Sequence, residues 1–419
     1  MSAIIEKRNL TTELESIFLT SGFAADANRT KAFKAFMAMG LPGNKSEEYK
    51  FTPITRALEK IFEADAGRDR IETHLPSTHL LLIPDLKCNV LAFVNGTFSI
   101  EHSVLLDEDV KFQLTKQDAA ANGADPFDLL NQALHPELLE ISVASKKLIQ
   151  HPVAIIYWFD SPQFVFANPR WKFTLGAQSS VSIIEYTLSP GSIYFNNKHS
   201  LIEVGENASL EFTSIQNGPA TDIQVNNSFV HISSSARVAC FTITLDGQLV
   251  RNNLSLIVDG QGVDAHLHGL YLITKNTLAD NHTVVDHRKP NSYSNELYKG
   301  IMNGNAKGVF NGKIYVRPDA QKTNAFQSNR NILLSESATI NTKPQLEIWA
   351  DDVKCSHGCT TGQMDEEALF YLRSRGISKE MSRSMLLNAF AAETIAPMKN
   401  EMLRNFLDGL ITEKLNKSF

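Results

Sequence analysis

The segment with the greatest chemical potential lies near residue 355, where Cys355, His357 and Cys359 occupy alternate positions. Side chains two apart in a β-strand point to the same side, so an extended strand would place all three on one face. Thiolate and imidazole are ligands suited to iron, zinc or iron–sulfur clusters. A closed structural zinc site needs four ligands. The pattern therefore predicts an incomplete site whose other ligands come from elsewhere, with ordinary packing of the cysteines as the alternative.

Four more histidines fall close together in the sequence: His266 and His268, then His282 and His287. Their polar surroundings favour histidines that satisfy backbone groups in turns, and a path for metal ions or protons is the alternative. The stretch Gly40–Ser46 superficially resembles a phosphate-binding loop, but it lacks the Gly before Lys and has no preceding strand. No nucleophile elbow, His-Glu-x-x-His or Cys-x-x-Cys motif occurs, so we expect a protein that is not an enzyme by itself.

A long-period repeat indicates how the region before Cys355 is built. Four segments superimpose, each with a turn residue first, a small residue fourth and apolar residues sixth and eighth. They begin at Gly176, Gly205, Ser233 and Gly260, which are 29, 28 and 27 residues apart. A strand–turn–strand unit of this size buries its apolar face only by stacking on further copies. The repeat predicts a β-solenoid over residues 151–360, with a β-sandwich as the alternative. It fades after residue 270, although strands are expected at Gly308–Val316 and Leu346–Ala350.

Helical patterns flank the predicted solenoid. We expect a helical N-terminal domain at residues 1–75, a mixed α/β connecting region at 76–150 and a helical C-terminal domain at 361–419. In the last of these, Asp365 and Ser378 are expected N-caps, and Pro397 is expected in the first turn of the final helix. The wide apolar faces of these helices must pack on the solenoid or on another chain. Their large apolar residues include Met385, Phe390, Phe406 and Leu407.

Composition excludes several classes of protein. The 419 residues carry a net charge of −6, which argues against nucleic acid as the main partner. The longest apolar run, Val153–Phe159, is far shorter than the roughly 20 residues that a membrane helix needs. Charged residues at positions 6–8 precede any long apolar stretch, so we expect no secretory signal. The four sparse cysteines then indicate reduced thiols and a cytoplasmic location.

Several motifs resemble the SufB/SufD family of iron–sulfur cluster assembly proteins. They are Arg251-Asn-Asn-Leu, Asp280-Asn-His-Thr, Gly308-Val-Phe-Asn-Gly-Lys-Ile314, Ala325-Phe-Gln327, Leu346–Gly358 and Leu369–Ile377. The Glu48-Tyr-Lys-Phe-Thr52 segment is similar to the family's N-terminal Glu-x-Trp-Lys-Tyr-Thr motif, with Tyr and Phe in place of its aromatic residues. The Lys354-Cys-Ser-His-Gly358 run fits the SufD branch better than the SufB branch.

This resemblance implies a right-handed parallel β-helix between two helical domains, in a non-catalytic subunit of the SUF scaffold. It implies a SufB-like partner bound through the β-helix, a SufC-like ATPase bound through the C-terminal helices, and a homodimer when the chain is alone. By the same resemblance, His357 and Cys355 are candidate ligands of a transient iron–sulfur cluster shared with the partner. Cys359 is a weak candidate because the family commonly has a small residue there. Met385, Phe390, Phe406 and Leu407 are candidates for ATPase docking.

The resemblance also links such complexes to a reduced flavin that mobilises iron, although no flavin motif occurs in the sequence. Two other functions are compatible with a β-solenoid. One is a stand-alone β-helical enzyme acting on carbohydrate, since parallel β-helices host many such activities. The other is a homo-oligomeric scaffold that handles no metal.

Overall fold

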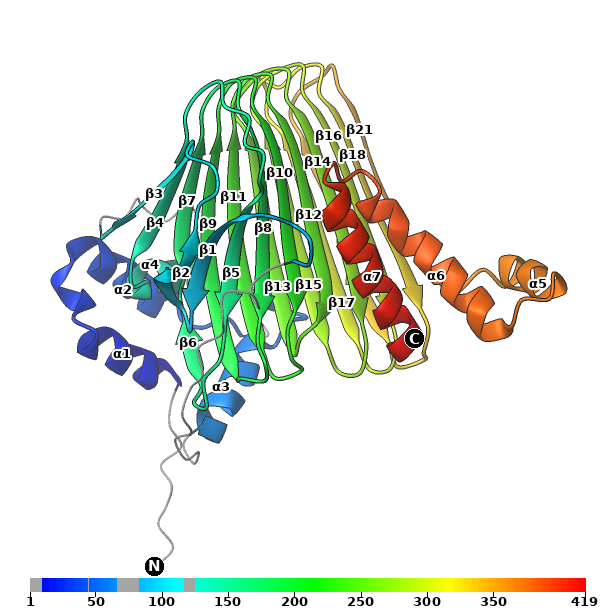
Figure 1. Cartoon of the computed structure of the whole chain (residues 1–419), viewed down its shortest axis with the longest axis horizontal. Coiled ribbons are helices and arrows are strands. Elements are labelled where there is room, and N and C mark those ends of the chain that lie inside the picture. The colour runs from blue at the N-terminus through cyan, green and yellow to red at the C-terminus, as the bar shows by residue number, and fades with distance from the viewer. Residues whose placement is uncertain (1–9, 44, 66–82, 117–124) are drawn as a thin grey trace, which may run out of the picture.

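A computed structural model describes residues 10–43, 45–65, 83–116 and 125–419 of the chain. Parallel strands dominate it and wind into a solenoid of about eight turns over residues 138–362. Figure 1 shows these strands side by side, with the chain advancing along the stack from cyan to yellow. The predicted β-solenoid is confirmed. The β-sandwich is excluded because the stacked strands pair in parallel with partners one full turn away.

Successive strands alternate between two sheets, which we call sheet A and sheet B. Sheet A contains β1 (Asn89–Val94), β2 (Thr97–Val104), β5 (Val153–Trp158), β8 (Ser180–Leu188), β10 (Ser209–Asn217), β12 (Arg237–Asp246), β14 (Asp264–Ile273), β16 (Tyr293–Met302), β18 (Asn324–Leu333) and β21 (Lys354–Gly362). Sheet B contains β3 (Val110–Thr115), β4 (Leu138–Val143), β6 (Val165–Ala167), β7 (Arg170–Leu175), β9 (Tyr194–Val204), β11 (Ile223–Ile232), β13 (Leu249–Val258), β15 (Leu278–His287), β17 (Lys307–Val316), β19 (Thr339–Thr342) and β20 (Gln345–Ile348). At the N-terminal end, β1–β2 and β3–β4 pair antiparallel.

The repeat continues beyond residue 270, where the sequence pattern was expected to fade. Residues in register on successive sheet A strands are Ser180, Ser209, Arg237, Asp264, Tyr293, Asn324 and Lys354. The turns therefore keep a length of 27 to 31 residues to the end of the stack. The pattern disappears from the sequence because inward positions that are apolar in the early turns, such as Leu267, become polar at Glu296 and Gln327.

The interior of the solenoid, which we call the lumen, is mostly apolar, with large rings such as Trp171 and Phe173 fully buried. It also holds a buried ion pair between Lys198 and Glu185, whose side chains are 2% and 1% exposed. The Tyr157 hydroxyl donates to Glu185 at 2.8 Å. Because a buried charge is costly without a partner, these bonds determine whether this part of the lumen is stable.

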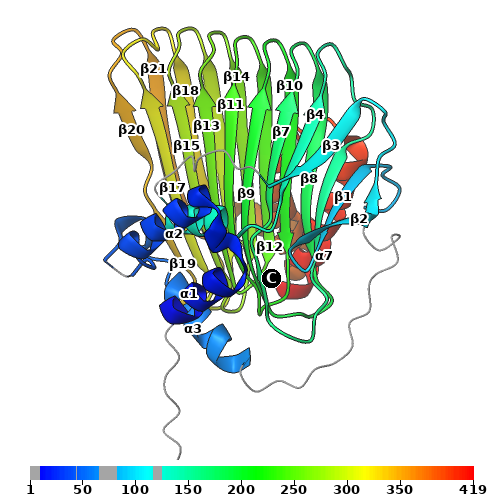
Figure 2. The same ribbon diagram turned by 90° about the vertical axis from the view of Figure 1, so that its left-hand side faces the viewer.

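Helices cover the outer face of sheet B over β9, β11, β13 and β15, close to the N-terminal ends of these strands (Figure 2). They are α1 (Leu10–Thr20), α2 (Ala27–Met39), α3 (Ile54–Asp65) and α4 (Pro126–Leu134), with short 3-10 turns η1 (Phe23–Ala25) and η2 (Glu47–Tyr49). Their apolar residues pack on Phe195, Ile223 and Leu249 of sheet B. Residues 1–9 and 66–75 of the expected N-terminal domain, and 76–82 and 117–124 of the expected connecting region, lie outside the described residues.

The C-terminal helices are α5 (Glu366–Ser374), α6 (Lys379–Ile395) and α7 (Glu401–Ser418). Figure 1 shows α7 lying across sheet A, while α5 and the first part of α6 extend away from the stack. The C-terminal half of α6 packs on β14 and β16. Asp365 and Ser378 cap α5 and α6, as predicted. The prediction for Pro397 is wrong, because α7 begins after Asn400, whose side chain accepts a hydrogen bond from the Leu403 backbone N–H. Within the described residues, no helix combines the length and apolarity that a bilayer crossing requires.

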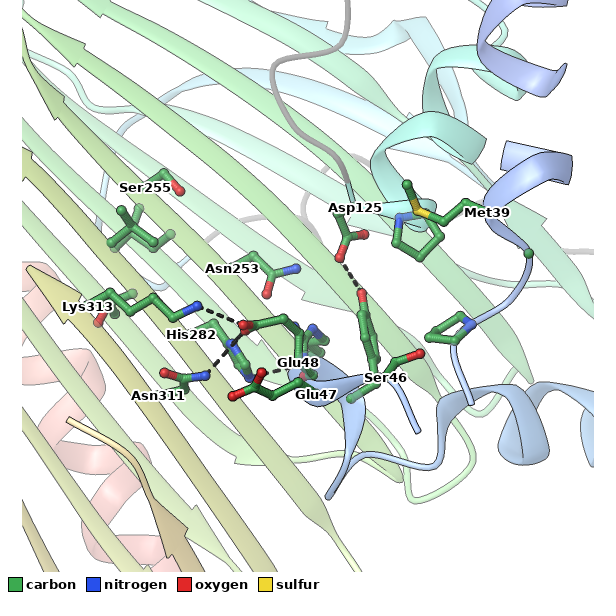
Figure 3. Close-up of a pocket in the computed structure, with 18 residues that line it drawn as sticks. Met39, Ser46, Glu47, Glu48, Asp125, Asn253, Ser255, His282, Asn311 and Lys313 are labelled. Carbon is green, nitrogen blue, oxygen red and sulfur yellow. Dashed lines mark hydrogen bonds and ion pairs between the residues drawn. The ribbon is translucent and has the colours of Figure 1, made fainter. Parts of the chain in front are cut away.

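Six side chains fasten the N-terminal helices to sheet B, and we call them the N-terminal joint: Glu48, Thr52, Arg251, Asp280, His282 and Lys313 (Figure 3 shows Glu48 between His282 and Lys313). Glu48 Oε1 accepts from Lys313 Nζ at 2.7 Å, and Glu48 Oε2 lies 3.3 Å from His282 Nδ1. Asp280 accepts from Arg251 Nη1 and from the Thr52 hydroxyl, both at 2.5 Å. The hydrogen bonds from His282 and then Lys313 lower the pKa of Glu48 to about 2.

Replacing Glu48 by Gln should lower the free energy of unfolding by about 1 kcal/mol at neutral pH, because a half-exposed carboxylate loses its ion pairs. A carboxyl whose pKa is lowered on folding contributes stability above its unfolded value of 4.5, and loses it as the pH falls toward about 2. The difference between wild type and E48Q in urea unfolding should therefore shrink steadily below about pH 5. Glu47→Gln is the control, because Glu47 is 75% exposed. A difference that does not change with pH would contradict this account.

Replacing Lys198 by Met should destabilise the chain by about 3–5 kcal/mol, because it leaves the Glu185 carboxylate buried without its counter-charge. The double variant K198M/E185Q removes both charges and should be markedly more stable than K198M. Denaturant unfolding of the two variants and the wild type measures this. If the double variant is no more stable than K198M, the cost comes from packing around Lys198 and not from the unpaired charge.

Candidate functional site

The C-terminal end of the solenoid is open. β21 is the last strand of sheet A, and β18 is the neighbour with which it pairs. In sheet B, β19 and β20 both pair with β17 and complete the same turn. Within the described part of the chain, no further strand pairs with β21. The last turn therefore presents a free strand edge and an uncovered lumen.

The structure brings Cys355, His357 and Cys359 to the lumen side of β21. They are in register with Ala325, Gln327 and Asn329 of β18, which are 0%, 3% and 0% exposed. Cys355 is half-buried and packs against the lumen core. The sulfur of Cys359 lies 3.0 Å from the Thr342 hydroxyl of β19, on the facing sheet. His357, between them in the strand, is exposed.

These three side chains are candidate ligands, but together they do not complete a metal site. Same-face neighbours in a strand are about 6.7 Å apart, which is too far for three of them to share one ion. Among the described residues, no group of three or more His, Cys, Asp or Glu side chains could hold a metal ion. Burial raises the pKa of Cys355, so its thiol is the favoured form without a metal. The imidazole of His357 is exposed, as is the thiol of Cys359, whereas Cys355 is half-buried.

The other four histidines do not gather into one path. His266 and His268 stack on β14 with ring centroids 6.2 Å apart, and burial lowers the pKa of His268 to about 4. His282 belongs to the N-terminal joint, where its Nε2 lies 2.9 Å from Asp280. His287 is buried at the end of β15 and its Nε2 lies 2.9 Å from the Ser294 hydroxyl. Each is thus occupied in a local contact.

A pocket of about 510 Å³ opens beside the N-terminal joint, between the Ser46–Tyr49 loop and sheet B (Figure 3). Its lining does not fit the phosphates of a flavin nucleotide. Glu47, Glu48 and Asp125 line it with carboxyl groups, while Arg251 and Lys313 are already paired with Asp280 and Glu48. We therefore do not assign this pocket as a flavin site.

The sequence does not predict that the six side chains of the N-terminal joint come together. The Glu48–Thr52, Arg251 and Asp280 motifs were each noted for their resemblance to the family, but nothing in their spacing places them together. In the structure the Arg251 guanidinium lies 3.9 Å from the centre of the Tyr49 ring, and Asp280 accepts bonds from Arg251 and Thr52. The signal available in the sequence was that three separate polar motifs contain an Arg, an Asp and an aromatic residue, which are residue types that can pair when buried.

The candidate docking residues divide between surface and core. Met385 on α6 is 44% exposed and Phe390 is partly buried. On α7, Leu407 is 0% exposed because it packs against the outer face of sheet A, and the Phe406 ring contacts the Tyr186 ring. Further apolar side chains are exposed nearby: Phe370, Tyr371 and Met381 are 73%, 57% and 57% exposed.

Comparison with known proteins agrees with this architecture. Residues 158–390 match the family model described as "SUF system FeS cluster assembly, SufBD core domain", and residues 10–134 match "SufBD protein N-terminal region". The chain is 28% identical to the iron–sulfur cluster assembly protein SufD of Escherichia coli, over 99% of both chains. It is 28% identical to a SufBD family protein of Synechocystis, over 85% of this chain and 84% of that one.

The SufD protein of Bacillus subtilis is 26% identical, over 80% of this chain and 77% of its own length. The core match spans more than half of the 419 residues and coincides with most of the solenoid and the first part of the C-terminal helices. This chain therefore belongs to the SufBD family of SUF-system iron–sulfur cluster assembly proteins.

Proposed function

We propose that this chain is a SufD-like, non-catalytic scaffold subunit that builds an iron–sulfur cluster jointly with a SufB-like partner. The observation that carries the proposal is the uncovered last turn, where exposed His357 and half-buried Cys355 lie beside a free strand edge. A partner chain that pairs with this edge covers the lumen and can add the missing ligands. His357 supplies one ligand, Cys355 is the second candidate and Cys359 is the weakest.

The free edge favours a SufB-like chain as the occupant, because a homologous solenoid presents an edge of matching length and twist. Pairing of two such ends satisfies the backbone groups of both last strands. A homodimer through the same edge is the expected state of the chain without its partner. The carbohydrate-active alternative is disfavoured, because the family to which the chain belongs assembles iron–sulfur clusters.

The exposed apolar side chains of α5 and α6 are the proposed docking surface for a SufC-like ATPase. Phe370, Tyr371, Met381 and Met385 form this set, and we call it the α5–α6 patch. It extends beyond the end of the stack, as Figure 1 shows for the two helices. Large apolar groups that stay exposed in a folded chain are typical of protein interfaces. Phe406 and Leu407 serve the packing of α7 instead.

A polar contact connects that surface to the last turns. The Lys299 amine of β16 pairs with Glu393 of α6 and donates to the Phe390 carbonyl at 2.9 Å. Glu393 also lies 3.6 Å from the Arg330 guanidinium of β18, the strand next to β21. A force applied to α6 by ATP-driven movement of the ATPase is thereby passed to the strands that carry the candidate ligands. The protein works in the cytoplasm in this proposal, with its four cysteines as free thiols.

Replacing His357 by Ala should abolish cluster build-up in the complex while leaving assembly with the partners intact. Anaerobic reconstitution with iron and sulfide, followed by visible absorbance and size-exclusion chromatography, measures both. Ser356→Ala is the matched control, because Ser356 lies on the opposite side of the same strand and should leave build-up unchanged. Normal cluster formation by H357A would exclude a ligand role for His357.

Replacing Phe370 and Met381 together by Ser should prevent co-purification of the ATPase. Because both side chains are exposed, the change should alter the chain's own unfolding free energy by no more than about 0.5 kcal/mol for each site. Met402→Ser on α7 is the control, since Met402 is 55% exposed but lies outside the α5–α6 patch. If the double variant retains the ATPase at wild-type stoichiometry, the docking surface lies elsewhere on the chain.

A further inference from the structure

A column of inward side chains runs through the lumen to His357. In register on successive sheet A strands it contains Ile183, Phe212, Cys240, Leu267, Glu296, Gln327 and His357. The first four are apolar and belong to the lumen core. Glu296 and Gln327 are 1% and 3% exposed, yet both are polar. The column thus changes from apolar to polar in the two turns that precede His357.

The Gln327 amide is held by one end only. Its Nε2 donates to Glu296 Oε2 at 2.7 Å, while its Oε1 has no hydrogen-bond partner although it is buried. A buried carbonyl without a partner is costly, so this group calls for a physical reason. Since the nitrogen end is committed to Glu296 on β16, the oxygen end is left for the other neighbour in the column. That neighbour is His357 on β21.

The surroundings hold the amide in this orientation. A Cβ atom added to Gly312 of β17 would lie 2.2 Å from Gln327 Nε2, so the facing backbone approaches the amide closely and leaves it little room to swing. Burial raises the pKa of Glu296 to about 7. Both the neutral and the ionised carboxyl have an oxygen that can accept from Gln327, so the orientation of the amide does not depend on that proton.

We propose that Gln327, oriented by Glu296, is the positioning residue for His357: its Oε1 accepts the N–H of one imidazole nitrogen and leaves the other nitrogen free to bind iron. Metal-binding histidines generally donate their second N–H in this way, to a carboxylate or a carbonyl, which fixes the tautomer and the orientation of the ring. In the separate chain His357 is exposed and the bond is not made. It forms when the partner covers the last turn. This inference rests on the proposed ligand role of His357.

The test uses the reconstituted complex in which this chain alone carries ¹⁵N-histidine. Before iron is added, the solid-state ¹⁵N spectrum should show His357 in one tautomer, identified by its absence in H357A. In Gln327→Leu the two tautomers should be populated within about 3-fold of each other, and the iron concentration for half-maximal cluster formation should rise about 10-fold. Gln216→Leu removes another lumen amide, far from β21, and should change neither quantity.

A pair of further variants separates positioning from folding. Q327E places two carboxyls together, whereas the exchange E296Q/Q327E restores a donor at 296 and keeps an acceptor at 327, so the exchange should retain the single tautomer of His357. If Q327L matches the wild type in tautomer and iron dependence while H357A builds no cluster, the inference fails and the proposed function stands. If Q327L does not assemble, two populated His357 tautomers in the exchange E296Q/Q327E overturn the inference. Cluster formation by H357A would overturn the proposed function itself.

Discussion

The rest of the structure depends on one constraint, which is that each strand of a parallel stack needs a neighbour on both sides to satisfy its backbone. Inside the solenoid the next turn always supplies that neighbour. At the N-terminal end the antiparallel pairs β1–β2 and β3–β4 close the two sheets. At the C-terminal end β21 has a neighbour on one side among the described residues. The stack ends where the candidate ligands Cys355 and His357 lie, so in the proposed function one unsatisfied edge serves both association and chemistry.

The lumen explains why this end could not be recognised as a continuation of the repeat. A repeat is detected through apolar residues at equivalent positions, and in the early turns these are residues such as Phe212 and Leu267. Toward the open end the equivalent positions hold Glu296, Gln327 and His357. Backbone pairing keeps the same register, because it does not depend on which side chain points inward. The loss of the sequence pattern is therefore a consequence of the polar chemistry that surrounds the candidate site.

The sequence was sufficient for features that arise from local pattern, and insufficient for those that arise from long-range register. The alternation of apolar residues and the length of the repeat predicted the solenoid. Capping preferences predicted Asp365 and Ser378 as N-caps, and the two-residue spacing of Cys355 and His357 predicted that they share a strand face. The assembly of Glu48 with His282 and Lys313 depends on which turn the N-terminal loop meets, and no local pattern states that. Leu407 was equally ambiguous, because an apolar helix face looks the same whether it packs within the chain or on a partner.

The two helical regions bind to opposite sheets, and this sets the direction in which the proposed force on α6 would act. The N-terminal joint ties its loop to β13, β15 and β17 of sheet B, while Lys299 and Arg330 tie α6 to β16 and β18 of sheet A. The last turn spans both sheets, with β21 on one side and β19 and β20 on the other. A load on α6 thus acts on sheet A while the N-terminal joint braces sheet B. In the proposed function, the candidate ligands on β21 would then move relative to the facing strands, and this displacement would open and close the shared site.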